Sequence, residues 1–451
     1  MAEQTTYADS GVDIELGDDV SKMLYNAAKQ TWVNRKGKLG EVIVPFDDFS
    51  GVRAINVSNL PFGTMMNIGF DGVGTKVKIA QMMRDHRTIA RDLTAMVCDD
   101  AVVRGAEPVL MGTILDVNSL KNSGKPFTEE VRQLCEGYVN AARDANVAIV
   151  NGEVAELGEQ VGGFGSEYFF SQFALGYISL HLRNSTNQHL RSVSKRMADL
   201  ADYLRSEDSE FREKLFPKMH PKEKSLIRKF EKMRTLNYNW GAGVVWFAKK
   251  ERMFTGREIQ EGDYLVGLKE NGFRSNGLSL VRRILEKNYG KSWHDPEARG
   301  FSDSEVSLAR YVLTPSKIYS GAVVEMTGGY CGDVKVEVHG VAHITGGGIP
   351  GKLGRMLKPS GLGAVIDSAF EPPHIMKFIQ ELGKVEDREA YKTFNMGIGM
   401  VIATPDPDGV IEIAQKRGIG GQTIGYVCSN PGIRIRNMGA NRGSSESFLS
   451  F

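Results

Sequence analysis

The chain has few cysteines, and none of them stand in a metal-binding or disulfide pattern. Cys98, Cys135, Cys331 and Cys428 are scattered through 451 residues without a Cys-x-x-Cys pair. This spacing argues against a zinc site or a disulfide framework and is typical of proteins from a reducing compartment. We therefore expect a cytoplasmic protein.

The sequence also lacks an excess of either charge and any long apolar run. Its 56 Lys and Arg residues nearly cancel its 55 Asp and Glu residues, so we expect no nucleic-acid partner and no attraction to an anionic membrane. No run of about 18 apolar residues occurs, and the N-terminus has no basic region followed by an apolar core. With 41% hydrophobic residues, the chain can bury a sizeable core and is long enough for two domains.

The most informative stretch is 67–76, Asn-Ile-Gly-Phe-Asp-Gly-Val-Gly-Thr-Lys. An apolar segment that predicts a buried strand breaks here into a glycine-spaced turn. Gly72 and Gly74 allow the backbone to approach an anion, Lys76 supplies a positive charge, and Asp71 can hold a divalent cation. The spacing is not that of a Walker A loop, and a simple glycine-rich turn between strand and helix is the alternative.

A predicted helix follows this turn. Apolar residues recur at helical spacing from residue 89 to 103, and the other face carries Asp92, Asp99 and Asp100. Adjacent acids usually lie on a solvated face. Because the helix leads into a second apolar run at 109–115, its polar face could instead return toward the end of the first strand.

A second apolar strand, predicted at 147–150, leads into a loop with two more acids, Glu153 and Glu156. Together with Asp71 and the acids of the preceding helix, these carboxylates are what a magnesium-nucleotide site needs, because Mg²⁺ takes oxygen ligands and shares them with phosphates. The alternation of strands and helices predicts α/β layering.

Two segments differ in composition from the rest. Between residues 183 and 234 there are 14 Lys or Arg and eight Asp or Glu, and the apolar spacing predicts a charged helical hairpin. A docking element for an acidic partner is the alternative. The tail 437–451 is rich in Gly, Ser and Asn, and we expect it to be disordered.

The second half carries its own glycine and polar motifs. A helix is predicted to begin after Ser275-Asn276, with either residue as its N-cap. Further along, His339 and His343 precede three glycines at 346–348, which could cradle a phosphate with their amides. A histidine is more often structural, and this pair lacks the signal of a third metal ligand.

In their order along the chain, these motifs resemble those of the phosphoribosylformylglycinamidine cyclo-ligases, also called aminoimidazole ribonucleotide synthetases. They are Gly-Val-Asp at 11–13, Asp-Gly-Val-Gly-Thr-Lys at 71–76, Asp-x4-Gly-Ala-x-Pro at 100–108, Gly-Glu-x-Ala-Glu at 152–156, Ser-Asn-Gly-x-Ser-Leu-Val-Arg at 275–282, Pro-x-x-Ile-Tyr at 315–319, His-Ile-Thr-Gly-Gly-Gly at 343–348 and Phe-Asn-x-Gly-x-Gly-Met at 394–400. Each motif is weak alone. Eight in family order are specific to the superfamily, and the last three favour the cyclo-ligases.

The resemblance implies a PurM-like two-domain fold of the α/β (α+β) class. Residues 1–250 would form the N-terminal ATP-binding domain, whose strands pair across a homodimer, and residues 251–436 the C-terminal domain. The implied reaction is the ATP-dependent ring closure of formylglycinamidine ribonucleotide to aminoimidazole ribonucleotide, with ADP and phosphate as the other products. The substrate is thus a phosphorylated ribonucleotide, and the cofactors are ATP and Mg²⁺.

The resemblance also implies roles for single residues. Asp71 and Asp100 would bind Mg²⁺, with Asp99 or Glu153 assisting. Asp100, Lys76 and His343 would be catalytic, with Lys76 in contact with nucleotide phosphate. The implied nucleotide contacts are Gly72, Gly74, Thr75, Lys76, Gly105, Asn276, Gly346 and Gly347.

Four departures from the family pattern keep other functions open. Ala8 stands where the family usually has a lysine, segment 45–52 replaces a glycine-rich loop, Arg274 replaces a histidine, and Val154 replaces a threonine. Arginine cannot act as an acid or base near neutral pH. The alternatives are another ATP-dependent member of the superfamily, or a nucleotide-binding protein without turnover.

Overall fold

The computed structural model describes residues 14–43, 53–55, 57, 60–122, 125–161, 192–196, 199, 214–219, 236–290, 293–294, 307–441 and 446–451. Within these ranges the chain divides into two compact units. One comprises 14–23, 114–133 and 153–239, and the other comprises 24–113, 134–152 and 240–451. Ala8, segment 45–52 and most of the predicted hairpin at 183–234 lie outside the described residues.

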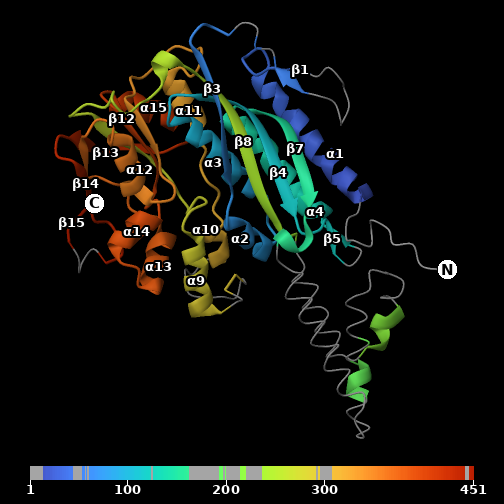
Figure 1. The fold of residues 1–451 in the computed structure, drawn as a ribbon. Helices are drawn as coiled ribbons and strands as arrows, with labels where there is room; N and C mark the ends of the chain where they lie inside the picture. Colours follow the sequence, from blue (N-terminus) through green and yellow to red (C-terminus); the bar gives the residue numbers. More distant parts are fainter. Residues whose placement is uncertain are drawn as a thin grey trace. The chain divides into compact units, whose positions relative to one another are not determined.

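Groups of one to three helices and of one to three strands follow one another along the described parts of the chain (Figure 1). The helices are α1 (Ile14–Thr31), α2 (Lys76–Met83), α3 (Ile89–Val102), α4 (Thr128–Ala145), α9 (Leu278–Tyr289), α10 (Leu308–Val312), α11 (Ser320–Thr327), α12 (Gly348–Leu357), α13 (His374–Gly383), α14 (Asp387–Thr393) and α15 (Pro407–Lys416), with short 3₁₀ turns at Trp32–Arg35, Gly158–Val161, Phe216–Lys218 and Lys250–Arg252. The strands are β1 (Val42–Ile43), β2 (Ala54–Ile55), β3 (Thr64–Gly72), β4 (Glu107–Val117), β5 (Lys121–Asn122), β6 (Lys125–Pro126), β7 (Ala148–Glu156), β8 (Tyr238–Lys249), β9 (Tyr264–Lys269), β10 (Gly340–His343), β11 (Gly363–Ile366), β12 (Ile398–Thr404), β13 (Gly421–Cys428), β14 (Gly432–Arg436) and β15 (Phe448–Ser450). None of the described helices is long and apolar enough to cross a membrane.

The first sheet has four strands in the order β3-β8-β4-β7. β3 pairs antiparallel with β8 from Thr64 opposite Lys249 to Gly72 opposite Gly241, so β3 is an edge strand. In the larger unit, a buried cluster that includes Val109, Ala148 and Phe247 forms a core against this sheet. The predicted α/β class is confirmed.

β7 corrects one prediction. Residues 151–156 were expected to leave the sheet as a loop, but β7 continues to Glu156. In the larger unit, Gly152 lies close to the carbonyl oxygen of Thr113 in β4, because a glycine leaves room for the neighbouring backbone: a Cβ there would lie 3.3 Å from that oxygen.

The second sheet lies wholly in the larger unit and has seven strands in the order β10-β12-β9-β13-β11-β14-β15. Neighbouring strands run antiparallel except β11 and β14, which are parallel. Apolar residues of β9, β10 and β12 pack in one core with α11, α15 and the end of α3 (Figure 1). This core joins α3 to the second sheet within the same unit.

The C-terminal tail is ordered where it is described. Residues 437–451 were expected to be disordered, yet β15 pairs antiparallel with β14 and buries Leu449. The prediction was wrong because it weighed only the Gly, Ser and Asn content of the tail. The apolar residues near its end complete the edge of the sheet.

His339 is held between two carboxylates at the start of β10. Its Nδ1 lies 2.9 Å from Oδ2 of Asp263, and its Nε2 lies 3.0 Å from Oε1 of Glu337. Burial alone lowers the pKa of His339, but the hydrogen bonds and charges of Glu337 and Asp263 outweigh it and raise the pKa above its ordinary value. We infer that both ring nitrogens donate and that the imidazole is charged.

We expect His339 to stabilise the fold most below about pH 6.5, its ordinary pKa. Because the pKa is higher in the folded state, this contribution falls as the pH rises through the folded value. Chemical denaturation of the parent and of His339→Gln at about pH 6 and about pH 9 measures it. The parent's advantage should be larger at the lower pH, and an advantage that does not change with pH would show that the imidazole is neutral.

Candidate active site

The glycine-spaced turn joins a strand to a helix, but the strand, predicted to be buried, is largely exposed because β3 lies at the edge of its sheet. β3 ends at Gly72 and α2 begins at Lys76, so the turn consists of Val73, Gly74 and Thr75. Gly74 has a φ of +68°, a conformation that favours glycine. Both Gly74 and Thr75 are exposed, and their backbone is open to a ligand.

Two other motifs lie against this turn. The hydroxyl of Thr75 is 3.3 Å from that of Ser279, in the first turn of α9. A Cβ on Gly74 would lie 4.0 Å from the carbonyl oxygen of Ser275, and one on Gly346 would lie 3.6 Å from Oδ1 of Asn276. The tertiary structure thus brings together three glycine-bearing segments that are far apart in the sequence.

Ser275 and Asn276 do not cap α9. The N-cap is Gly277, with a φ of +75°, and no side chain caps the helix. Instead, Oγ of Ser275 and Nδ2 of Asn276 are buried atoms without a hydrogen-bond partner among the described residues. Buried polar atoms are usually satisfied, so these two atoms fit a site that is completed by a polar ligand.

The three glycines of the second half form the beginning of α12. Gly346 and Gly347 are exposed, and Gly347, with a φ of +92°, is the N-cap. At Gly348 a Cβ would come within 1.9 Å of the carbonyl oxygen of Tyr391, so only glycine allows this close packing. The free amides at a helix N-terminus suit an anion.

Two carboxylates influence each other beside these segments. Burial raises the pKa of Asp71, and the negative charge of Asp100 raises it further. Burial also disfavours the charged form of Asp100, but the hydrogen bond from His343 and the nearby positive charges lower its pKa overall. Because its pKa is lowered, Asp100 is ionised near neutral pH. Its side chain is 53% exposed and therefore accessible to a ligand.

This donor set fits Mg²⁺ that is shared with a ligand. Among the described residues, no three His, Cys, Asp or Glu side chains are grouped closely enough to hold a metal by themselves. Mg²⁺ commonly takes only one or two carboxylates and completes its shell with phosphates and water. Asp71 and Asp100 match that pattern, because a cation between them would relieve their repulsion.

Asp99 does not match it. Its side chain is fully buried, its Oδ1 accepts hydrogen bonds from the backbone amides of Tyr319 and Ser320, and its Oδ2 accepts one from Arg274. Burial raises the pKa of Asp99, and the guanidinium of Arg274 opposes that rise. The oxygens of Asp99 are thus used within the protein, and its assistance to the metal stays a prediction.

Arg274 occupies the centre of this buried network. The guanidinium has no exposed surface and donates to Asp99, to Glu270 at 2.9 Å and to Nε2 of His343 at 2.8 Å. Its backbone φ of +57° is unusual for a residue with a side chain. An uncharged substitute would leave two buried carboxylates without their counter-ion.

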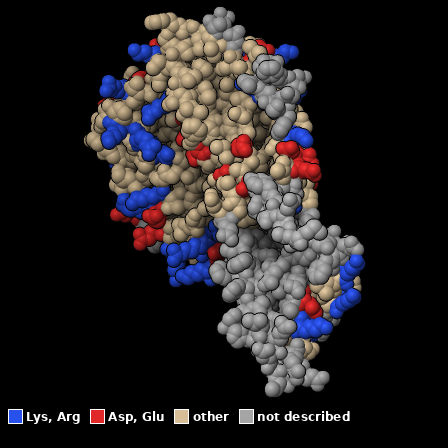
Figure 2. All heavy atoms as spheres, turned by 45° about the vertical axis from the view of Figure 1, so that its right-hand side comes forward, with Lys and Arg blue, Asp and Glu red and all other residues tan. Residues whose placement is uncertain are grey.

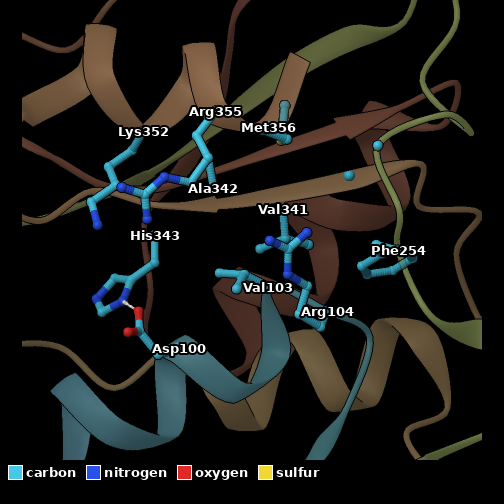
Figure 3. A pocket seen from close by; sticks show the side chains of 12 residues that line it. Asp100, Val103, Arg104, Phe254, Val341, Ala342, His343, Lys352, Arg355 and Met356 are labelled. Carbon is cyan, nitrogen blue, oxygen red and sulfur yellow. Dashed lines mark hydrogen bonds and ion pairs between the residues drawn. The ribbon is translucent and has the colours of Figure 1, made fainter. Parts of the chain in front are cut away.

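Arg274 also fixes the protonation of His343. A guanidinium can only donate, so Nε2 of His343 must accept and its Nδ1 carries the proton. That Nδ1 donates to Oδ1 of Asp100 at 2.6 Å (Figure 3). His343 is thus a neutral imidazole that orients the Asp100 carboxylate.

Lys76 is not at the surface of the site. Its side chain is fully buried, and its ammonium donates to Oδ1 of Asp92 at 2.7 Å and to the carbonyl oxygen of Thr314. Asp92, also fully buried, accepts from Ser316 as well. The expected contact of Lys76 with nucleotide phosphate stays a prediction, although the ammonium has two protein partners here. Of the two alternatives for the polar face of α3, burial is the one found at Asp92 and Asp99.

Gly105 and Glu153 have different surroundings. Gly105 is buried with a φ of +73°, and a Cβ there would lie 2.2 Å from the carbonyl oxygen of Arg252, so packing explains the glycine. Glu153 is exposed on β7 in the smaller unit. Their roles toward nucleotide and metal stay predictions.

Sequence reasoning missed three cations beside Asp100. Arg104 follows α3, whereas Lys352 and Arg355 lie on α12. All three side chains line one cavity of about 160 Å³ (Figure 3). The sequence did contain a signal for two of them. Lys352 and Arg355 come shortly after the triple glycine and are spaced three apart, so they share one face of a helix.

Comparison with known proteins assigns the family. The phosphoribosylformylglycinamidine cyclo-ligase of Pseudothermotoga lettingae is 30% identical to this chain over 425 residues, which are 94% of the chain and 96% of that relative. The chain belongs to the phosphoribosylformylglycinamidine cyclo-ligase family. The cyclo-ligase of Bacillus cytotoxicus is also 30% identical, over 95% of the chain and 96% of its own length.

Two family models match separate parts of this cyclo-ligase family member. The AIR synthase related protein N-terminal domain matches residues 55–178, and the corresponding C-terminal domain matches residues 260–436. Among solved structures, Escherichia coli HypE, a hydrogenase maturation protein, has a TM-score of 0.51 with 12% identity and covers 93% of each chain. That likeness shows the fold, which agrees with the PurM-like class.

Proposed function

We propose that this chain catalyses the ATP-dependent ring closure of formylglycinamidine ribonucleotide to aminoimidazole ribonucleotide, releasing ADP and phosphate. The observation that carries the proposal is the similarity to cyclo-ligases over nearly the whole length of both chains. The meeting of three glycine-bearing segments beside Asp71 and Asp100 supports a nucleotide site at the same place.

The chemistry explains why ATP is needed. An amide oxygen is a poor leaving group, so the formyl amide oxygen first takes the γ-phosphoryl group while the bond to ADP breaks. The amidine nitrogen then attacks the formyl carbon, the carbon–oxygen bond breaks, and the oxygen leaves as part of phosphate while the nitrogen loses a proton. Bound Mg²⁺ would neutralise phosphate charge during the transfer.

The residues of this chain would divide the work as follows. Asp71 and Asp100 would hold Mg²⁺, and the amides of Gly74, Gly346 and Gly347 would face nucleotide phosphates, with Thr75 and Asn276 as polar contacts. His343, as a neutral donor to Asp100, would orient that carboxylate. Arg274 would act through His343 and replaces the family's histidine without acid or base chemistry.

Complementation tests the proposed reaction. Expression of the chain in a purine-requiring strain that lacks its cyclo-ligase should restore growth, and the purified protein should form aminoimidazole ribonucleotide only with ATP. Phosphate release from ATP without the purine substrate, and no complementation, would favour another ATP-dependent member of the superfamily. Nucleotide binding without phosphate release and without complementation would favour a nucleotide-binding paralogue without turnover.

We also propose a division into an N-terminal domain, 1–250, and a C-terminal domain, 251–436, supported by the two separate family matches at 55–178 and 260–436. A cytoplasmic location is proposed as well, supported by four cysteines that are all free thiols. The face drawn in Figure 2 carries residues of both charge signs.

A homodimer through β3 is the third part of the proposal. This edge strand exposes Met66, Ile68 and Phe70 to 63%, 46% and 75%. An exposed apolar edge strand is a template for pairing with another chain. A second copy of this chain would cover these residues.

Phe70→Glu is therefore expected to convert the dimer to monomers, because a charge would have to be buried between the copies. Analytical ultracentrifugation measures the change. Tyr426→Glu, at an exposed apolar position on β13 of the other sheet, is the matched control and should leave the dimer intact. A Phe70→Glu protein that sediments like the parent would exclude this interface.

A further inference from the structure

The cavity beside Asp100 has a lining with an unusual charge. It measures about 160 Å³ and lies between the end of α3, the middle and end of α12 and strand β10. Figure 3 shows Lys352 and Arg355 extending from α12 and Arg104 on the opposite side. Its lining consists of Asp100, Val103, Arg104, Phe254, Gly256, Gly340, Val341, Ala342, His343, Lys352, Arg355 and Met356.

The three cations of this cavity have no carboxylate of their own. Within the part of the chain that the structure describes, neither Arg104, Lys352 nor Arg355 forms an ion pair. Burial and the charge of Arg355 lower the pKa of Lys352, and Asp100 and Asp71 offset this only in part. Lys352 is half-buried, whereas Arg104 and Arg355 are exposed. Three like charges that line one cavity suit an anionic ligand.

Asp100 does not neutralise the cluster. It is the single carboxylate in the lining, and it accepts the proton of His343 Nδ1 at 2.6 Å. Three positive side chains therefore face one negative side chain that is already engaged. The remaining positive charge matches a phosphate monoester, for which Arg and Lys are the usual binding residues.

Size and the apolar wall restrict the ligand further. Val103, Phe254, Val341 and Met356 line the rest of the cavity, which suits the carbon face of a sugar. A volume of about 160 Å³ is below the roughly 300–1,000 Å³ of pockets that enclose a drug-sized ligand. The cavity accommodates a phosphorylated sugar end but is small for a whole nucleotide.

We propose that Arg104, Lys352 and Arg355 bind the 5′-phosphate of the ribonucleotide substrate in this cavity. This assignment rests on the proposed function, because it places the phosphate of that substrate next to Asp100. The nucleotide phosphates would lie instead at the glycine segments, none of which lines the cavity. The site thus separates the two phosphate-bearing ligands of the reaction.

Calorimetric titration with two matched probes tests the assignment without turnover. Formylglycinamidine ribonucleotide carries the phosphate, and the corresponding riboside lacks it. Lys352→Met and Arg355→Met should each weaken binding of the ribonucleotide by about tenfold or more, since a hydrogen bond to a charged group contributes on that scale. Binding of the riboside should not change, and Lys358→Met, beyond the cavity at the end of α12, should change neither.

Each outcome of this titration decides. Loss of the ribonucleotide alone supports the phosphate site, and Lys352→Arg should then recover most of the affinity. An equal loss of affinity for both probes would indicate a structural effect, and an unchanged affinity would show that the cations do not bind the phosphate. A loss of affinity for a non-hydrolysable ATP analogue instead would assign the cavity to the nucleotide. Each of these three results overturns the proposal. Binding that behaves as expected in a protein that does not form product would refute the proposed function alone.

Discussion

Replacing Lys76 by methionine is expected to lower the free energy of unfolding by about 3–5 kcal/mol, the range for breaking a buried ion pair by removing one partner. The methionine fills much of the same space, but it leaves the fully buried Asp92 without its counter-charge. Affinity for an ATP analogue should change little, because the ammonium points to Asp92 and Thr314 rather than to solvent. Urea denaturation and calorimetry measure the two effects.

Two further variants distinguish the buried pair from a ligand contact. A double variant, Lys76→Met with Asp92→Leu, should recover part of the lost stability, because it removes the unpaired charge as well. Lys416→Ala, at the surface of α15, should leave the unfolding midpoint nearly unchanged. If Lys76→Met were as stable as the parent but bound the nucleotide much more weakly, the result would support a direct contact between Lys76 and phosphate.

Asp100→Asn is expected to reduce magnesium-dependent turnover by about 100-fold or more, since a ligand to a metal that stabilises transition-state charge is worth several kcal/mol. The fold should persist. Asn can still accept the hydrogen bond from His343 through its amide oxygen, and half of the Asp100 side chain is exposed. Steady-state kinetics over a range of Mg²⁺ concentrations, together with thermal unfolding, separate activity from stability.

Asp71→Asn should reduce magnesium-dependent turnover to a similar extent. The charge of Asp100 raises the pKa of Asp71, so the two carboxylates are close enough to share one cation. Asp408→Asn, in the first turn of α15, is the matched control outside the site and should keep the parent's rate. If Asp100→Asn or Asp71→Asn turns over at the parent's rate with the same magnesium dependence, that carboxylate does not hold the metal.

Local patterns were sufficient for several elements. The turn at 73–75 follows from glycine spacing, and α3 follows from the helical periodicity that begins at residue 89. α4 also carries a local signal of a helix start, with Glu129 and Glu130 in its first turn. These features depend on neighbours within a few positions, which the sequence contains.

The patterns failed where long-range contacts decide. Asp92 and Asp99 lie on the polar side of α3, a pattern that usually indicates a solvent-exposed face. Both are nevertheless buried, and their hydrogen-bond partners Ser316 and Tyr319 are more than 200 residues away in the sequence. β15 is ordered by pairing with β14, which the composition of the tail does not reveal.

The sequence by itself determined the family, the α/β class and the residues that carry the nucleotide motifs, because those motifs are short and stand in a fixed order. Only the tertiary structure decided what each charged residue does. A lysine in a glycine turn and an aspartate on a helix have the same local signature whether they meet a ligand or a buried counter-ion. Burial separates the two cases: Lys76 and Asp99 are fully buried with protein partners, whereas Asp100 reaches the surface.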